Sequence, residues 1–571
     1  MGRLRRILIG LLALIGLGTV LTVLLLGMGG WWLVQRFERS LQLPGEIVLV
    51  ADLRGSLEDG PDRGFAGLSL RAQPRLSELV LALDRAAGDP RVRGLVARLD
   101  DSAHGFATTQ ELRDAVARFR RSGRPAVAFA DSFGELSAGN EGYYLATAFD
   151  QLVLQPVGLV GLTGLLVEVP FARELLDRIG IEPAFVRREA YKTALDSATE
   201  TGLTTANRAM LTRLLDELSR QLVQGIAKGR NLDEATVRAL LDGGPYTAEE
   251  ALERRLVDRL GYWDEVLAAA GPDESHVDIA DYVAADDGPP GTGTGVALVR
   301  GIGAIARGEG DGLGGPDGIA ADDLAEALAA AIDDPEIAAI LFRIDSPGGS
   351  PVASETIARQ IRRAKAAGKP VVVAMGDAAA SGGYWIAMDA TTIVAQPATL
   401  TGSIGVIAGK PVLQRLWQQL DVRWAQLPAA ANAAMWSLNT PYTEVGRARL
   451  NELVDALYDS FKAGVAAGRG LAPDRVAEIA QGKVWTGAEA HALGLVDSLG
   501  GLAEAQDAVR AALGLAPGTP LDLRPYPPPR TPFQRALELL RVELQPLAGL
   551  RALLATVPAQ DLARMPVLRI H

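Results

Sequence analysis

The chain has 571 residues, of which 48% are hydrophobic, and it carries a formal net charge of −12. Its length and apolar content exceed what one ordinary core requires, so two or more domains are expected. It has no cysteine, which excludes disulfides, thiolate metal sites and cysteine nucleophiles. The acidic balance, with a pI near 5.1, argues against nucleic-acid binding, which needs clustered lysine and arginine.

Residues 1–45 are expected to form a membrane anchor and a short linker. The run from Ile7 to Val34 contains no charged residue, and a bilayer-spanning helix needs about 20 apolar residues. Three arginines precede this run, which predicts that the N-terminus stays in the cytoplasm and that the rest of the chain lies outside. A cleaved signal peptide is the alternative, but the run is too long and lacks a clear small-x-small cleavage site.

The rest of the chain contains much the same domain twice. Residues 46–283 and 296–522 both open with an apolar strand and a turn, continue through an amphipathic helix, and then alternate apolar strands with helices. A Gly-, Pro- and Asp-rich linker at 284–295 joins them, and a tail at 523–571, expected to be helical, follows. Apolar strands alternating with helices predict a parallel sheet covered on both faces. The fold class is therefore α/β, with two tandem domains from an internal duplication.

The second copy carries a serine at a turn that suits catalysis. After an apolar strand that ends at Met375, the loop GDAAASGGYW places Ser381 just before a predicted helix. A serine at such a turn can project its hydroxyl while backbone amides and the helix N-terminus face developing negative charge. Gly382 and Gly383 allow a peptide backbone to approach closely. Taken alone, Ser381 is better explained as a helix cap, because capping is a common use of serine.

A second glycine turn favours the catalytic interpretation. The loop IDSPGGS, at residues 344–350, exposes backbone N–H groups at the carboxyl end of a strand, where parallel α/β sheets bind ligands. One amide from Gly349 and one from Gly382 would form an oxyanion hole. Gly348 and Gly383 are candidate substrate-binding positions beside it. A Pro-Gly-Gly turn can also be no more than a tight turn.

The first copy lacks these parts but has a lysine that the second copy lacks. Its matching loop reads DDSAHGF, without paired glycines, and Asn140 stands at the serine position. It carries Lys192 in REAYKTALDS, whereas the second copy reads NAAMWSLNT, with Met435 at the matching place. This division predicts one active site assembled from both copies.

Lysine is the best candidate for the base that activates the serine. None of the four histidines has the context of a Ser-His-Asp triad, and a lysine is the other known option. A lysine accepts a proton only when neutral, so its pKa must fall by about three units, which burial between two domains can achieve. The more common use of a lysine is an exposed surface position. Its place in the duplicated pattern favours catalysis for Lys192.

Four motifs in order, AYKTA around Lys192, IDSPGGS, DAAASGGYW and TGSIGV at residues 401–406, resemble the signal peptide peptidase A family, also called protease IV. The resemblance is to its long, membrane-anchored bacterial form and covers roughly Glu46 to Leu523. It implies two ClpP/crotonase-like domains and a serine endopeptidase with a Ser-Lys dyad. Ser381 would be the nucleophile, Lys192 the general base and Ser403 the hydroxyl that orients the lysine, with no metal or cofactor.

The same resemblance implies a biological setting. Such proteins lie in the bacterial inner membrane with their catalytic domains on the periplasmic side, degrade remnant signal peptides and other hydrophobic or unfolded peptides, and form homotetramers. We therefore expect peptide substrates, a bilayer contact through the N-terminal helix, and no nucleic-acid partner.

Two rival functions remain. A crotonase-type acyl-CoA enzyme would share the glycine loops but has no evident use for an anchor, a duplicated domain or a lysine partner. A catalytically inactive membrane scaffold is the non-enzymatic rival. The intact serine, lysine and SPGG loop argue against it.

Overall fold

The computed structural model describes residues 43–55, 57, 59–60, 74–101, 104–285, 293–310 and 318–528. The predicted membrane anchor, most of the predicted linker and most of the predicted C-terminal tail lie outside these residues. Within the described part of the chain, no helix is long and apolar enough to span a bilayer.

The N-terminal half is built on a parallel sheet of six strands, in the order β8-β4-β3-β2-β1-β9. The inner strands consist mostly of valine, leucine, isoleucine, alanine and phenylalanine, as expected where helices cover both faces of a sheet. The elements of this half are β1 (Ile47–Asp52), α2 (Leu76–Gly88), β2 (Val92–Leu99), α3 (Phe106–Arg121), β3 (Ala126–Ala130), α4 (Asn140–Ala146), β4 (Gln151–Leu154), β5 (Leu159–Val160), α5 (Arg173–Arg178), β6 (Glu182–Arg187), α6 (Asp196–Thr199), α7 (Thr205–Arg230), α8 (Glu234–Gly243), β7 (Tyr246–Thr247), α9 (Ala248–Glu253), β8 (Arg259–Leu260), α10 (Trp263–Ala270), β9 (His276–Asp278) and α11 (Ile279–Ala284).

The C-terminal half has a sheet in which β19, β15, β14, β13, β10 and β20 lie side by side and parallel. A branch adds β16 beside β14, and β18 pairs antiparallel with β16. Its elements are β10 (Thr294–Ile302), β11 (Ala304–Ala306), β12 (Gly318–Ala320), α12 (Ala321–Asp333), β13 (Ala339–Ser346), α13 (Pro351–Ala366), β14 (Val371–Ala380), α14 (Gly382–Ala387), β15 (Thr392–Ala395), β16 (Leu400–Gly402), β17 (Ile407–Val412), α15 (Gln414–Gln419), α16 (Glu444–Arg469), α17 (Pro473–Ile479), β18 (Val484–Thr486), α18 (Gly487–Ala492), β19 (Ser498–Leu499), α19 (Leu502–Ala512) and β20 (Leu521–Tyr526).

The two halves repeat each other element by element. The strands β1, β2, β3, β4, β8 and β9 of the first sheet occupy the places of β10, β13, β14, β15, β19 and β20 in the second. Even single contacts recur: the hydroxyl of Tyr143 donates to the carbonyl of Leu256, and the hydroxyl of Tyr384 donates to the carbonyl of Leu495. The structure confirms the α/β class and the internal duplication. The last strand continues to Tyr526, four residues past the predicted end of the second domain at 522.

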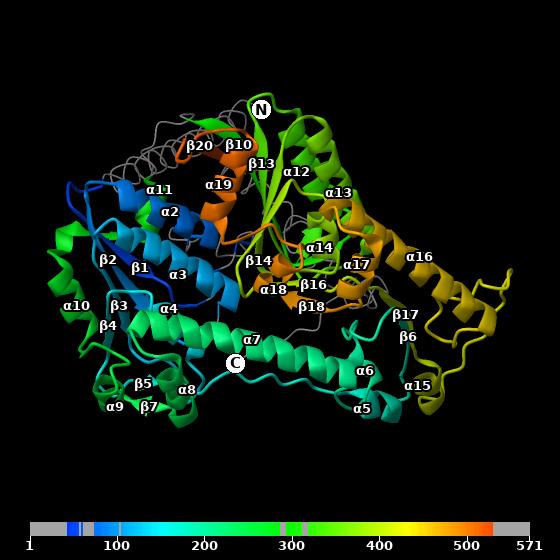
Figure 1. Ribbon diagram of the computed structural model, residues 1–571. Helices are drawn as coiled ribbons and strands as arrows, with labels where there is room; N and C mark the ends of the chain where they lie inside the picture. Colours follow the sequence, from blue (N-terminus) through cyan, green and yellow to red (C-terminus); the bar gives the residue numbers. More distant parts are fainter. Residues whose placement is uncertain are drawn as a thin grey trace, which may run out of the picture.

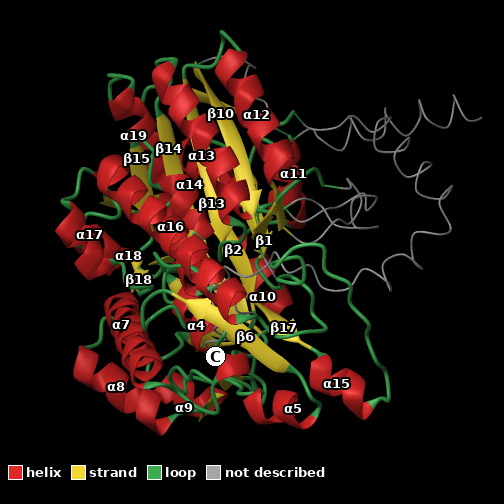
Figure 2. Cartoon of the chain, turned by 90° about the vertical axis from the view of Figure 1, so that its right-hand side faces the viewer, coloured by secondary structure: helices red, strands yellow, loops and turns green. Residues whose placement is uncertain are grey.

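One strand of each half also pairs with a strand of the other half. Strand β6 of the first half pairs antiparallel with β17 of the second, from Glu182 opposite Val412 to Arg187 opposite Ile407. The pair lies beside α16 (Figure 1, Figure 2). Helix α7 contacts both halves. Its residue Arg213 donates to the carbonyl of Val484 in the second half, and the helix also packs on α4 of the first half. The sequence pattern did not predict that a strand of one copy would pair with the other.

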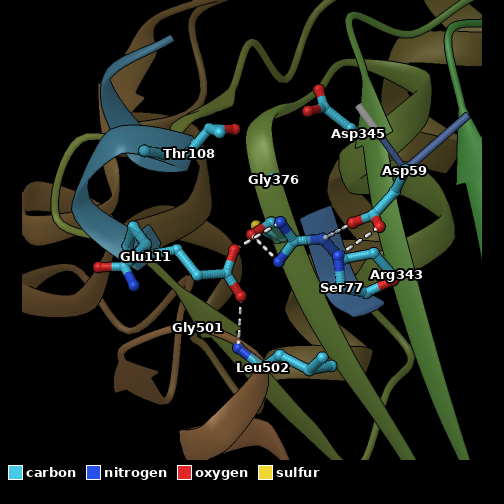
Figure 3. Close-up of polar contacts among 12 residues, drawn as sticks. Asp59, Ser77, Thr108, Glu111, Arg343, Asp345, Gly376, Gly501 and Leu502 are labelled. Carbon is cyan, nitrogen blue, oxygen red and sulfur yellow. Dashed lines mark hydrogen bonds and ion pairs between the residues drawn. The ribbon is translucent and has the colours of Figure 1, made fainter. Parts of the chain in front are cut away.

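A buried ion-pair cluster joins residues of the two halves (Figure 3). Arg343, on β13, lies 2.6 Å from the carboxylate of Glu111 on α3 and 3.2 Å from that of Asp59. Glu111 also accepts the N–H of Leu502 at 2.7 Å. Burial alone would lower the pKa of Arg343, but the two carboxylates hold it above its usual value. One cation therefore pairs with two acidic groups that come from the opposite half.

Arg343→Met tests how much this cluster stabilises the protein. The substitution leaves two buried carboxylates without their cation, and breaking a buried pair in this way costs about 3–5 kcal/mol. We therefore expect the thermal unfolding midpoint of the purified chain to fall by several degrees.

Arg93→Ala is the control. Arg93 pairs with Glu46 at 2.8 Å, but both side chains are more than half exposed, so its loss should leave the midpoint nearly unchanged. Equal midpoints for the two variants would contradict a stabilising role for the cluster.

Candidate active site

Ser381 lies in a strained turn between a strand and a helix. Strand β14 ends at Ala380 and α14 begins at Gly382. The backbone of Ser381 has φ +53°, a conformation that side-chain-bearing residues rarely adopt, and its N–H donates to the carbonyl of Gly402 at 2.8 Å. Strain of this kind is typical of turns that present a nucleophile. The side chain is only 2% exposed.

The side chain of Lys192 reaches this serine from the other half of the chain. Its Nζ lies 2.8 Å from the Oγ of Ser381, 3.0 Å from the Oγ of Ser403 and 2.9 Å from the carbonyl oxygen of Ser403. Lys192 is 1% exposed, and this burial lowers its pKa to about 7. The structure thus brings together three residues that the sequence analysis singled out.

The pairing of β6 with β17 explains how Lys192, Ser381 and Ser403 meet. Arg187, the last residue of β6, lies opposite Ile407, the first residue of β17, and the N–H of Arg188 donates to the carbonyl of Val406 at 2.9 Å. From this end of the pair the first strand leads on to Lys192, and the second leads back to Ser403. The pairing therefore delivers both residues to the same place.

Two backbone amides lie next to the serine turn. Gly382 is the first residue of α14, so its N–H has no acceptor within the helix. Gly349 is paired with Ile305 of β11 in a parallel bridge that uses the carbonyl of Gly348 and the N–H of Ser350, and so leaves the Gly349 N–H out. A Cβ atom at Gly382 would lie 3.0 Å from the Gly349 nitrogen, which places the two positions side by side.

Gly348 and Gly383 are the chain neighbours of the two glycines that carry these amides. Gly348 has φ +106°, and its carbonyl accepts the N–H of Ile305 at 3.0 Å. A Cβ atom at Gly383 would lie 2.8 Å from the carbonyl oxygen of Ser346, closer than side chains tolerate. The positive φ of Gly348 and the close packing at Gly383 are sufficient to explain both glycines, and their contact with a substrate stays a prediction.

The corresponding place in the N-terminal half has no nucleophile. Asn140 opens α4 as Ser381 precedes α14, but its side chain is committed to a local loop. Its amide nitrogen donates to the carbonyl of Gly164 at 2.9 Å, and its oxygen accepts the N–H groups of Thr163 and Gly164. The Asn140 side chain therefore stabilises a local loop, whereas the Ser381 side chain contacts a lysine.

The two amide positions have changed as well. Glu141 follows Asn140 where a glycine follows Ser381, and His104 stands two residues before α3, as Gly349 stands two residues before α13. Burial and the nearby carboxylate of Asp377 raise the pKa of Glu141 to about 7. Both positions therefore carry a side chain in the first half and a glycine in the second half.

Sequence reasoning missed the two segments that complete the site. The apolar run of β11 indicates a strand, but nothing in it shows that Ile305 would lie on the glycine loop. Likewise, β6 is short and of mixed polarity, so its pattern does not identify its partner. Among the described residues, no group of three or more His, Cys, Asp or Glu side chains is arranged to hold a metal ion.

Comparison with known proteins identifies the family. The model of peptidase family S49 matches residues 118–276 and 363–516, one segment in each half. The chain is 32% identical over 471 residues to "Serine protease SPPA, chloroplastic" of Arabidopsis thaliana, covering 80% of this chain and 68% of that protein. It is 31% identical over 521 residues to "Protease 4" of Salmonella typhi, covering 86% and 82%. It is 29% identical over 506 residues to "Protease 4" of Haemophilus influenzae, covering 82% and 79%. The chain therefore belongs to peptidase family S49 and is a serine peptidase of the SppA, or protease IV, type.

Proposed function

We propose that this serine peptidase is an endopeptidase with a Ser-Lys dyad, in which Ser381 is the nucleophile and Lys192 the general base. The observation that carries the proposal is the 2.8 Å contact between Lys192 Nζ and Ser381 Oγ, two buried groups from different halves of the chain. A lysine whose pKa lies near 7 is partly neutral at neutral pH and can accept the serine proton.

Ser403 directs the lone pair of the lysine. A neutral amine has two N–H donors and one lone pair. The carbonyl and hydroxyl oxygens of Ser403 can accept the two N–H groups, at 2.9 and 3.0 Å, which leaves the lone pair for the hydroxyl of Ser381. This arrangement explains why Lys192 has hydroxyl and carbonyl neighbours rather than a carboxylate, which would favour its charged form.

The reaction follows from these positions. Neutral Lys192 takes the proton of Ser381, and the serine oxygen attacks the carbonyl carbon of the peptide bond. The amides of Gly349 and Gly382 donate to the resulting oxyanion. The ammonium of Lys192 returns its proton to the leaving amine, and a water molecule then hydrolyses the acyl-enzyme with the same lysine as base.

The two rival functions fit the site less well. A crotonase-type acyl-CoA enzyme would also use ClpP/crotonase-like domains and glycine amides, but it needs no serine within hydrogen-bond distance of a lysine. An inactive scaffold would not retain a strained serine turn, a desolvated lysine and two free amides in one place, because each has a cost in stability.

We infer that the substrates are peptides, including remnant signal peptides and other hydrophobic or unfolded segments. The uncharged run from Ile7 to Val34 supports a single-pass anchor in the inner membrane, with the two halves on the periplasmic side. A homotetramer is the assembly we expect.

Ser381→Ala and Lys192→Ala should each abolish cleavage of a casein-like or signal-peptide substrate. Loss of the nucleophile removes the covalent route, and loss of the base should cost about 100- to 10,000-fold in rate. Labelling by a fluorophosphonate probe reports the same two losses independently of the substrate.

Lys410→Met is the matched control for Lys192→Ala. Lys410 is also fully buried, but its Nζ donates to the carbonyls of Met435 and Ser437 and not to Ser381. The folded fraction of this variant should keep its labelling. Cleavage that survives in Ser381→Ala would identify another nucleophile.

The pH dependence of kcat/KM should report the lysine. Below about pH 7 Lys192 is protonated and cannot accept the serine proton, so activity should rise as the pH increases through this value. Lys192→Arg should be inactive throughout, because a guanidinium is not deprotonated in this range. A profile without an inflection between pH 6 and 8 would argue against a desolvated lysine as the base.

Removal of residues 1–42 tests the anchor. The full chain should stay in the membrane fraction after an alkaline carbonate wash, since an apolar span of this length does not leave the bilayer. The shortened chain should appear in the soluble fraction and still react with the fluorophosphonate probe. A shortened chain that remains with the membranes would show that another segment binds them.

A further inference from the structure

Gly482 packs directly against the backbone of Lys192. It lies in the turn between α17 and β18 and has φ +74°. A Cβ atom at this position would lie 2.5 Å from the backbone nitrogen of Lys192 and 2.7 Å from its Cβ. Atoms at such distances overlap, so only a glycine leaves room for the lysine here.

Gly405 packs against the aliphatic stem of the same lysine. A Cβ atom at this position would lie 3.2 Å from the Cδ of Lys192 and 3.0 Å from the Cα of Gly482. The two glycines thus contact each other as well as the lysine. One faces its backbone and the other faces its stem, and together we call them the glycine sleeve.

The turns that form the sleeve also hold Ser403. The N–H of Gly482 donates to the carbonyl of Ile404 at 2.9 Å, and the N–H of Ser403 donates to the carbonyl of Lys483 at 2.7 Å. These two bonds join the turns into one unit. A shift of either turn therefore changes the position of Lys192 relative to the oxygens that accept its N–H groups.

We propose that Gly405 and Gly482 are positioning residues, which leave the space that Lys192 needs to enter from the other half and reach Ser381. The inference rests on the proposed role of Lys192 as general base and extends it to two residues that lie outside the reacting atoms. A methyl group at either position would displace the lysine from its serine partners. A misplacement of about 1 Å in a catalytic group can reduce the rate about 100-fold.

Gly482→Ala and Gly405→Ala test the proposal in the full, detergent-solubilised chain. For Gly482→Ala we expect kcat for a peptide substrate to fall about 100-fold with little change in KM. For Gly405→Ala, whose contact is looser, we expect a fall of about tenfold. In both variants the acidic limb of the kcat profile should move to higher pH, because a displaced lysine regains water and holds its proton more tightly.

Gly368→Ala is the matched control. Gly368 has φ +78°, close to that of Gly482, but no atom lies within 4 Å of the place where its Cβ would be. Its substitution therefore adds similar backbone strain without touching the lysine, and kcat and its pH profile should stay unchanged. If Gly482→Ala fails to fold, as judged by its thermal unfolding, Gly405→Ala decides alone. Glycine variants that keep the kcat and pH profile of Gly368→Ala overturn the proposal.

Lys192→Ala separates this inference from the proposed mechanism. If Lys192→Ala retains full activity, the lysine is not the base and the mechanism itself is wrong. If Lys192→Ala is inactive while both glycine variants are fully active, the mechanism stands and only the positioning role of the sleeve fails.

Discussion

The antiparallel pairing of β6 with β17 is the contact on which the active site depends. Each half alone has only part of the site: the first has Lys192, and the second has Ser381, Ser403 and the two amides. The paired strands carry the lysine into the second half, where it is enclosed and loses its water. Because desolvation is the cause of its lowered pKa, the same contact that positions Lys192 also keeps part of it neutral at neutral pH, as its proposed role requires.

The remaining interface holds β14, the strand that leads to Ser381. Asp377, four residues before Ser381 on β14, accepts the N–H groups of Ala107 and Thr108 at the start of α3 in the first half. Asp345 in turn accepts the N–H of Asp377 at 3.0 Å, and burial raises the pKa of both carboxyls. Along the same interface, Arg343 meets the carboxylates of the opposite half. Polar contacts between the halves thus reach Asp377 on the strand that ends next to Ser381, which couples the assembly of the two halves to the geometry of the candidate site.

Much of this arrangement follows from the sequence. The internal repeat predicts two α/β units, and the comparison of its copies pointed to Ser381 and Lys192 because each has a different residue in the other copy. The partners of those residues could not be predicted in the same way. An arginine such as Arg343 usually lies at the surface, and only the folded chain shows that it is buried between carboxylates. Gly482 is one of 63 glycines, and its importance depends on a backbone that approaches from nearly 300 residues earlier in the chain.

Enclosure between the halves should lower the pKa of Lys192 to about 7, and NMR of ¹³Cε-labelled lysine can measure this pKa. The chain has seven lysines, so the resonance of Lys192 can be assigned by its loss in Lys192→Arg. This resonance should titrate with a midpoint near pH 7, well below that of the exposed lysines. A midpoint close to about 10.4, the value of a free lysine side chain, would contradict it.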